Sequence, residues 1–222
     1  MSNPVFPDKS TTLLLPGPAG ALELAVDLPD PEATGQPVVA VICHPLPTEG
    51  GTMHNKVVTM LARSLRELGV TTVRFNFRGT GRSEGSFDAG PGEVEDLRAV
   101  VAWVREQRPV DLLWLAGFSF GAWVSISAAD ALEPHVLISI APPVGHEGRD
   151  FSDIRTPGMP WLVVMGDADE VVDSHAVYAW VEGLDRDVEL VKMPETSHFF
   201  HRKLIDLRGA VKNGVRGWLP NA

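Results

Sequence analysis

The chain has 222 residues, of which 44% are hydrophobic and 22% charged, and 29 acidic against 19 basic side chains give a formal net charge of −10. This composition excludes a mainly disordered chain, because its apolar content is enough to offset the entropy lost on folding. The acidity disfavours a nucleic-acid binder, which needs a basic face for phosphates, and the single cysteine excludes an internal disulfide.

No apolar stretch approaches the roughly 18 residues that a membrane-spanning helix needs. The polar, proline-rich first ten residues lack the apolar segment of a signal peptide. We therefore expect one cytoplasmic domain over residues 1–222, without nucleic-acid or membrane partners.

Strand and helix patterns alternate along the chain. An edge hairpin is predicted from residues 11–15 and 22–28, and apolar or β-branched runs predict further strands over residues 38–43, 71–77, 112–116, 135–140, 161–165 and 188–193. Helical patterns lie between these strands over residues 56–68, 93–107, 122–132, 174–183 and 201–218. The alternation predicts an α/β fold, a doubly wound and mostly parallel sheet of about eight strands with helices on both faces.

The sequence Gly-Phe-Ser-Phe-Gly at residues 117–121 stands between a predicted strand and a predicted helix. In an open parallel sheet, ligands bind beyond the carboxyl ends of the strands. A sharp turn flanked by glycines exposes the hydroxyl of Ser119, and the next N–H, that of Phe120, lies at a helix N-terminus that favours an oxyanion. By itself the pentapeptide is also compatible with a plain turn and a capping serine.

An acidic loop and a histidine follow two later strands. Residues 166–172 come directly after one predicted strand and contain Asp167 and Asp169, whereas His198 follows the next strand. The order of Ser119, then an acid, then a histidine is that of a serine-hydrolase triad. The histidine accepts the hydroxyl proton and the carboxylate fixes the imidazole tautomer, so the pattern predicts nucleophilic catalysis.

Three stretches resemble the α/β-hydrolase superfamily, and the resemblance extends over nearly the whole chain. They are CHPLPTEGGTMHNKVV at residues 43–58, RFNFRGTGRSEGSFDAGPGEVEDLRAVVAWV at residues 74–104 and LAGFSFGA at residues 115–122. The chain is most similar to a small bacterial branch without a lid, related to dienelactone hydrolases and short-chain esterases. This resemblance implies an α/β-hydrolase fold and a hydrolytic activity.

The resemblance also implies roles for individual residues. The nucleophile matches Ser119 and the base His198, and the family's G-x-x-D-x-hydrophobic spacing selects Asp169 as the acid, with Asp167 as the alternative. By similarity to the family's H-G-x-P stretch, the N–H of Leu46 is expected to complete the oxyanion hole. The proline before it stands where glycine is usual, but proline lacks only its own N–H, so this donor remains.

Other polar residues in these loops have structural interpretations. Glu170 and Asp173 are expected to cap the helix that begins near Ser174. His44 is expected to hold loops together. His201 is interpreted as a polar residue in the first turn of the last helix, with a metal pair formed with His198 as the weaker alternative.

The substrate is expected to reach an open site. Only residues 141–160 lie between the predicted strand that ends at Ile140 and the one that begins at Trp161, too few for a helical cap. An uncapped groove suits small or extended esters, and its apolar walls are expected from neighbours of the predicted triad and from the loop after residue 140. These predicted pocket residues are Phe118, Trp123, Pro143 and Phe199.

We therefore predict a serine hydrolase that cleaves a small carboxylic ester, or a thioester, through an acyl-enzyme on Ser119. A catalytically silent binding protein of the same fold is one alternative. A short-peptide serine peptidase is another, which needs a charged clamp for a peptide terminus; Arg82 and Glu49 lie on suitable loops. No metal or cofactor is expected, the predicted partner is the small-molecule ester, and the chain is expected to be a monomer or a homodimer.

Overall fold

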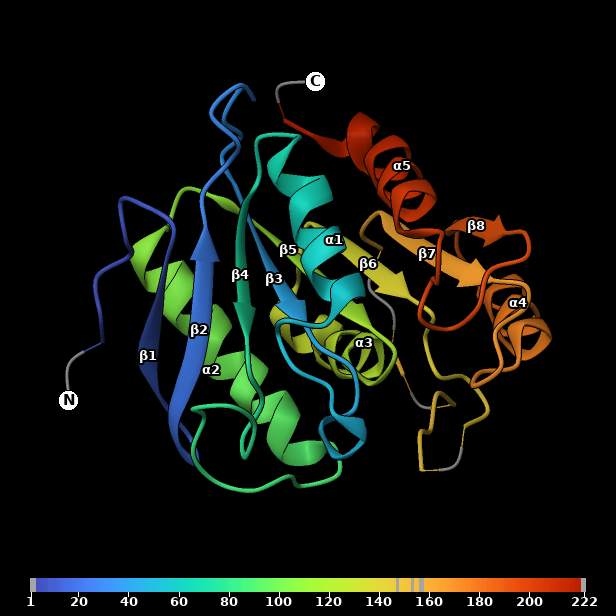
Figure 1. Ribbon diagram of the computed structural model, residues 1–222, viewed down its shortest axis with the longest axis horizontal. Helices are drawn as coiled ribbons and strands as arrows, with labels where there is room; N and C mark the ends of the chain where they lie inside the picture. The colour runs from blue at the N-terminus through green and yellow to red at the C-terminus, as the bar shows by residue number, and fades with distance from the viewer. Residues whose placement is uncertain (1–2, 147, 153, 156–157, 221–222) are drawn as a thin grey trace.

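The computed structural model describes residues 3–146, 148–152, 154–155 and 158–220, and Figure 1 shows a central sheet between two layers of helices. The sheet has eight strands in the order β1-β2-β4-β3-β5-β6-β7-β8. Their bounds are Thr11–Gly17 for β1, Gly20–Asp27 for β2, Val38–Cys43 for β3, Thr71–Phe75 for β4, Leu112–Phe118 for β5, Val136–Ile140 for β6, Trp161–Gly166 for β7 and Glu189–Met193 for β8.

The pairing confirms a doubly wound, mostly parallel sheet. β1 pairs with β2 and β2 with β4 in antiparallel fashion, and all neighbours from β4 through β3 to β8 are parallel. Every residue of β3, β4, β6 and β7 is buried, as a parallel sheet covered on both faces requires. The carboxyl ends of β3 to β8 consequently meet at one edge of the sheet.

Helices cover both faces of the sheet. Helices α1 and α5 pack together on one face and α2 and α3 on the other (Figure 1). The helix bounds are Lys56–Arg66 for α1, Pro91–Gln107 for α2, Phe120–Leu132 for α3, Ser174–Glu182 for α4 and Leu204–Val215 for α5, with short 3-10 helices η1 at Pro47–Glu49 and η2 at Arg216–Trp218. None of the helices among the described residues is long and apolar enough to cross a membrane.

The last helix is shorter than the pattern predicts. The sequence favours a helix over residues 201–218, but α5 begins only at Leu204 and ends before η2. Phe200 and Arg202 have φ angles of +54° and +60°, which lie outside the right-handed helical region, so the backbone turns there before the helix can start. His201 is therefore an exposed turn residue and not part of a first helical turn.

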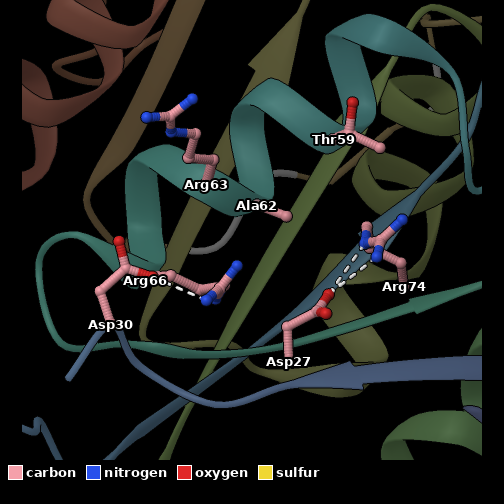
Figure 2. A pocket seen from close by; sticks show the side chains of 7 residues that line it. All are labelled: Asp27, Asp30, Thr59, Ala62, Arg63, Arg66 and Arg74. Carbon is pink, nitrogen blue, oxygen red and sulfur yellow. Dashed lines mark hydrogen bonds and ion pairs between the residues drawn. The ribbon is translucent and has the colours of Figure 1, made fainter. Parts of the chain in front are cut away.

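Two ion pairs lie at the antiparallel edge of the sheet, one between β2 and β4 and one between α1 and the segment after β2. Figure 2 shows a cavity of about 270 Å³ in which arginines of α1 and β4 lie beside aspartates of β2 and the segment after it. Arg74 donates to one carboxylate oxygen of Asp27 at 3.1 and 2.8 Å and to the carbonyl oxygen of Met53 at 2.7 Å. Arg66 pairs with Asp30 at 2.7 Å. Because both guanidinium groups already have carboxylate partners, these contacts are structural ties.

A more deeply buried ion pair joins the loop after β4 to α2. The carboxylate of Asp96 accepts hydrogen bonds from the backbone N–H of Arg78 at 2.9 Å and from its Nη2 at 2.7 Å. The Asp96 side chain is 0% exposed and that of Arg78 13%. Bonding to this carboxylate raises the pKa of Arg78. The loop is therefore fixed to α2 by this ion pair. Loss of either side chain would leave the charge of the other without its partner.

Replacing Asp96 with asparagine is expected to lower the free energy of unfolding by about 3 kcal/mol, because it leaves the Arg78 charge buried without a counter-ion. Urea unfolding at neutral pH measures the change. The matched control is Glu95→Gln on the same helix, which breaks only an exposed pair with Arg98 and is expected to cost less than about 1 kcal/mol. Equal effects of the two substitutions would contradict a special role for the buried pair.

Candidate active site

Ser119 lies at the turn between β5 and α3 in a strained backbone conformation. Its φ and ψ are 53° and −119°, and its N–H donates to the carbonyl oxygen of Ile140 at 2.9 Å. A Cβ placed on Gly117 would lie 2.2 Å from the carbonyl oxygen of Gly121, and one on Gly121 would lie 2.4 Å from that of Cys43. Only glycine at both positions allows α3 to approach the strands this closely, and that approach forces the turn.

Three side chains from different loops form one hydrogen-bonded chain. The Oγ of Ser119 lies 3.1 Å from Nε2 of His198, and Nδ1 of His198 lies 2.7 Å from Oδ2 of Asp169. The side chains of His198 and Asp169 are 3% and 1% exposed. Since a carboxylate accepts at Nδ1, that nitrogen carries the proton and Nε2 is left to accept from the serine hydroxyl.

The two aspartates of the acidic loop point to different partners. The other oxygen of Asp169 accepts from the backbone N–H groups of the residues two and three positions later, at 2.8 and 2.7 Å. Asp167 instead accepts from the N–H of Glu195 at 2.7 Å. The structure therefore brings Asp169 to His198, and uses Asp167 to tie together the loops after β7 and β8.

Glu170 has a different role from the one that the sequence favours. It accepts from the backbone N–H of His198 at 3.0 Å, across 28 positions in the chain, and does not cap a helix. Asp173 does cap α4, by accepting from the N–H of His175 at 2.9 Å. Glu170 thus fixes the backbone of the histidine, and no local pattern signals it because its partner belongs to another loop.

Two backbone N–H groups suit the stabilisation of an oxyanion. Leu46 and Phe120 both line the same cavity as Ser119. Among the described residues, neither N–H donates to a protein acceptor. Phe120 is the first residue of α3, where backbone N–H groups lack partners within the helix. The carbonyl oxygen of Leu46 accepts from the N–H of Gly51 at 3.0 Å, which fixes the loop that carries this donor.

His44 anchors the loop that contains Leu46. Its Nδ1 lies 2.6 Å from the carbonyl oxygen of Pro45, and its Nε2 accepts from the N–H of Phe77 at 3.1 Å. Burial of the ring lowers the pKa of His44 to about 4, against an opposing effect of the bond to Pro45. The ring is therefore neutral at physiological pH, with its proton on Nδ1, and it links the end of β3 to the segment after β4.

A cavity of about 500 Å³ lies over Ser119. Two of the predicted pocket residues, Pro143 and Phe199, line it. The full set of lining residues is Pro45, Leu46, Glu49, Gly50, Gly51, Asn55, Ser119, Phe120, Pro143, His146, Arg149, Val171, Val172, His198 and Phe199. Glu49, Asn55, His146 and Arg149 add polar groups to this lining.

Phe118 and Trp123, the other two predicted pocket residues, lie outside this lining. Phe118 is fully buried, and its ring centroid is 5.1 Å from that of His198, so it supports the imidazole from within the core. Trp123 stacks on Phe120 at 6.0 Å, and its Nε1 donates to the carbonyl oxygen of Asp150 at 3.2 Å. Phe118 therefore lies within the core below the site, and Trp123 packs against Phe120 without lining the cavity.

His201 is not part of a metal-binding group in the described part of the chain. No cluster of three or more histidine, cysteine, aspartate or glutamate side chains among those residues is arranged to hold a metal ion.

The described residues between Ile140 and Trp161 contain no helix or strand over the site.

Comparison with known proteins places the chain in a family. The model of the X-Pro dipeptidyl-peptidase (S15) family matches residues 20–149, which is more than half of the chain. The chain belongs to this family of α/β hydrolases. The match covers Ser119 and Leu46 but ends before Asp169 and His198.

Solved structures extend the similarity of this hydrolase over its whole length. A crystal structure from Xanthomonas campestris, described as a member of the α/β serine hydrolases without lid, is 66% identical with a TM-score of 0.95 and covers 98% of this chain and 99% of that one. An α/β serine hydrolase homologue from Coxiella burnetii is 47% identical with a TM-score of 0.89, over 95% and 99% of the two chains. An uncharacterised protein of Rickettsia prowazekii is 33% identical over 79% of this chain and 77% of its own.

Acid is expected to destabilise this hydrolase through His44. Because burial lowers the pKa of His44 from 6.5 to about 4, the unfolded chain binds a proton more readily than the folded one as the pH falls below 6.5. The stability that the neutral ring of His44 contributes is fully present above pH 6.5 and is lost as the pH falls towards 4. The free energy of unfolding is therefore expected to be about 2 kcal/mol lower at pH 5. Urea unfolding at pH 7.5 and 5 measures the loss, and the His44→Gln variant should show a smaller one. An imidazole NMR titration of His44 near pH 6.5 would contradict the assignment.

Proposed function

We propose that the protein hydrolyses small carboxylic esters through an acyl-enzyme on Ser119. The observation that carries the proposal is the unbroken chain of contacts from Ser119 Oγ to His198 at 3.1 Å and from His198 to Asp169 at 2.7 Å. Ser119 and His198 border an open cavity, and the N–H groups of Leu46 and Phe120, which line it, have no acceptor within the described part of the chain. Membership of the α/β serine hydrolases supports hydrolysis as the reaction class.

The first half-reaction forms the acyl-enzyme. Ser119 Oγ attacks the ester carbonyl carbon while His198 Nε2 accepts the hydroxyl proton, and Asp169 stabilises the resulting imidazolium. The carbonyl oxygen becomes an oxyanion that accepts hydrogen bonds from the N–H groups of Phe120 and Leu46. As the tetrahedral intermediate collapses, the bond to the leaving oxygen breaks, and His198 gives its proton to the departing alcohol.

The second half-reaction releases the acid. Water attacks the acyl carbon as His198 Nε2 accepts one of its protons, and the same two N–H groups hold the second oxyanion. When this intermediate collapses, the carbonyl carbon separates from Ser119 Oγ, which recovers its proton from His198. The enzyme returns to its starting state, and one ester and one water have become one acid and one alcohol.

The cavity supports an ester of modest size. Its apolar walls come from Pro143, Val171 and Phe199, while the side open to water admits an extended group. Phe199 is 42% exposed and Val171 44%, so they form the rim. A thioester fits the same chemistry, because attack and oxyanion stabilisation are unchanged and thiolate is the better leaving group.

A short-peptide peptidase is the second candidate. The matching family model is named for X-Pro dipeptidyl-peptidase, and Glu49 lines the cavity where a carboxylate suits a peptide amine. Arg82, the other residue with a suitable loop position, is not among the lining residues. Assay of short proline-containing peptides beside esters separates the two candidates. Binding without turnover of either class would instead favour a catalytically silent protein.

A fluorophosphonate probe is expected to label the purified protein at Ser119, as mapped by peptide mass spectrometry. Because the hydroxyl needs its base, His198→Ala should lower ester turnover by about three orders of magnitude or more with the fold intact, and Ser119→Ala should abolish labelling. Circular dichroism of both variants controls for folding. A folded wild-type protein that neither reacts with the probe nor turns over short esters would overturn the proposal.

The two aspartates provide a matched test of the acid. Asp169→Asn is expected to reduce kcat by about four orders of magnitude, because the amide favours the wrong imidazole tautomer. Asp167→Asn keeps an oxygen that can accept from the Glu195 N–H and should retain most of the activity. Steady-state kinetics on one short ester compares them, and the reverse order of effects would move the acid to Asp167.

A further inference from the structure

Arg149 is the one arginine or lysine among the described residues that line the cavity over Ser119. It lies in the segment after β6, and its guanidinium carbon is 4.6 Å from the ring centroid of Phe120 and 5.0 Å from that of Trp123. Stacking on aromatic faces fixes the plane of a guanidinium group and favours its charged form. A positive charge of defined orientation therefore lies against Phe120, the residue next to Ser119.

One edge of this guanidinium group is left without a protein partner. Nη1 of Arg149 donates to the carbonyl oxygens of Ala89 and Gly148, both at 2.9 Å. Within the described part of the chain, its Nε and Nη2 groups donate to no acceptor, and no carboxylate forms an ion pair with it. In Arg78, the same Nε and Nη2 groups both donate to the carboxylate of Asp96. Arg149 thus lines the cavity and, within the described part of the chain, has no protein partner on the edge with which Arg78 binds a carboxylate.

The scaffold balances this charge only from a distance. Glu93 is the carboxylate that acts electrostatically on Arg149, but its two oxygens already accept from the N–H groups of Asp88 and Gly90 at 2.9 and 2.7 Å. Partial burial lowers the pKa of Arg149, because the guanidinium group has lost hydration that no carboxylate contact replaces. An anionic ligand in the cavity would supply the interaction that the guanidinium group has lost with water.

We propose that Arg149 binds a carboxylate of the substrate, so that the preferred esters carry a negative charge beside the bond that is cleaved. The proposal rests on the proposed function, because it names the substrate class of the same site. A guanidinium group binds a carboxylate through two parallel N–H···O bonds. The net charge of −10 repels anions in general, so their recognition requires a local cation such as this one. Glu49 lines the same cavity and disfavours a carboxylate at its own end.

The test compares esters that differ only in charge. Monoethyl succinate and ethyl isocaproate have acyl groups of matched shape, one ending in a carboxylate and the other in two methyl groups. Carboxymethyl butyrate and isobutyl butyrate make the same comparison on the alcohol side. We expect the wild-type protein to show a higher kcat/KM for the anionic member of at least one pair.

The substitution Arg149→Gln is expected to lower that charge preference about tenfold to a hundredfold, the range for a lost charge-assisted hydrogen-bond pair. Arg149→Lys should keep part of it. The matched control is Arg155→Gln, which removes the same charge from an exposed residue of the same segment that lines a different cavity, and it should leave the preference unchanged. Equal loss with charged and neutral esters in Arg149→Gln, or preference for the neutral member of both pairs, would overturn the proposal.

Calorimetry separates this proposal from the proposed function. The Ser119→Ala protein is titrated with monoethyl succinate and with ethyl isocaproate, alone and combined with Arg149→Gln. One outcome is that the wild-type protein turns over no ester, while Ser119→Ala binds the anionic ester and loses that binding when Arg149→Gln is added. This result would support the carboxylate site and refute the esterase. Turnover of neutral esters, with no anionic binding that depends on Arg149, would support the esterase and refute the carboxylate site.

Discussion

The close approach of α3 to the strands beneath it is the constraint on which the site depends. Gly117 and Gly121 let backbone atoms of β5, α3 and the end of β3 come within distances that no Cβ would allow. Ser119, between them, is thereby held at a φ of 53°. Strain of this kind persists only where the surrounding structure determines it, and here fully buried strands on either side do so. The result is a hydroxyl raised above the sheet at the start of a helix.

Buried polar contacts between loops complete the site. His44 ties the end of β3 to Phe77, Glu170 holds the backbone of His198, and Asp167 holds that of Glu195. Each contact joins segments that follow different strands, so the loops are positioned relative to one another as well as to the sheet. Preorganisation of this kind lets hydrogen-bond donors act on a developing charge without moving, which is the main source of electrostatic catalysis.

Charge is distributed unevenly between the scaffold and the cavity. Near the antiparallel edge, Arg66 and Arg74 are paired with aspartates, and Arg78 is neutralised by a buried carboxylate. Arg149, in contrast, faces uncharged carbonyl groups and aromatic rings. The difference matters because a paired guanidinium group contributes to the fold, whereas one with an open edge is available to a ligand.

The sequence by itself determined the order of the strands and helices, the elbow at residues 117–121 and the candidate nucleophile and base, because these depend on local periodicity, glycine spacing and chain order. Only the tertiary structure decided between Asp169 and its alternative Asp167 as the partner of His198, that Glu170 supports this histidine, and that Phe118, unlike Phe199, is buried below the cavity. The contacts of His198 with Asp169 and Glu170 join residues 29 and 28 positions apart. Their geometry depends on how the loops after β5, β7 and β8 converge at one sheet edge, which no local pattern of side chains encodes.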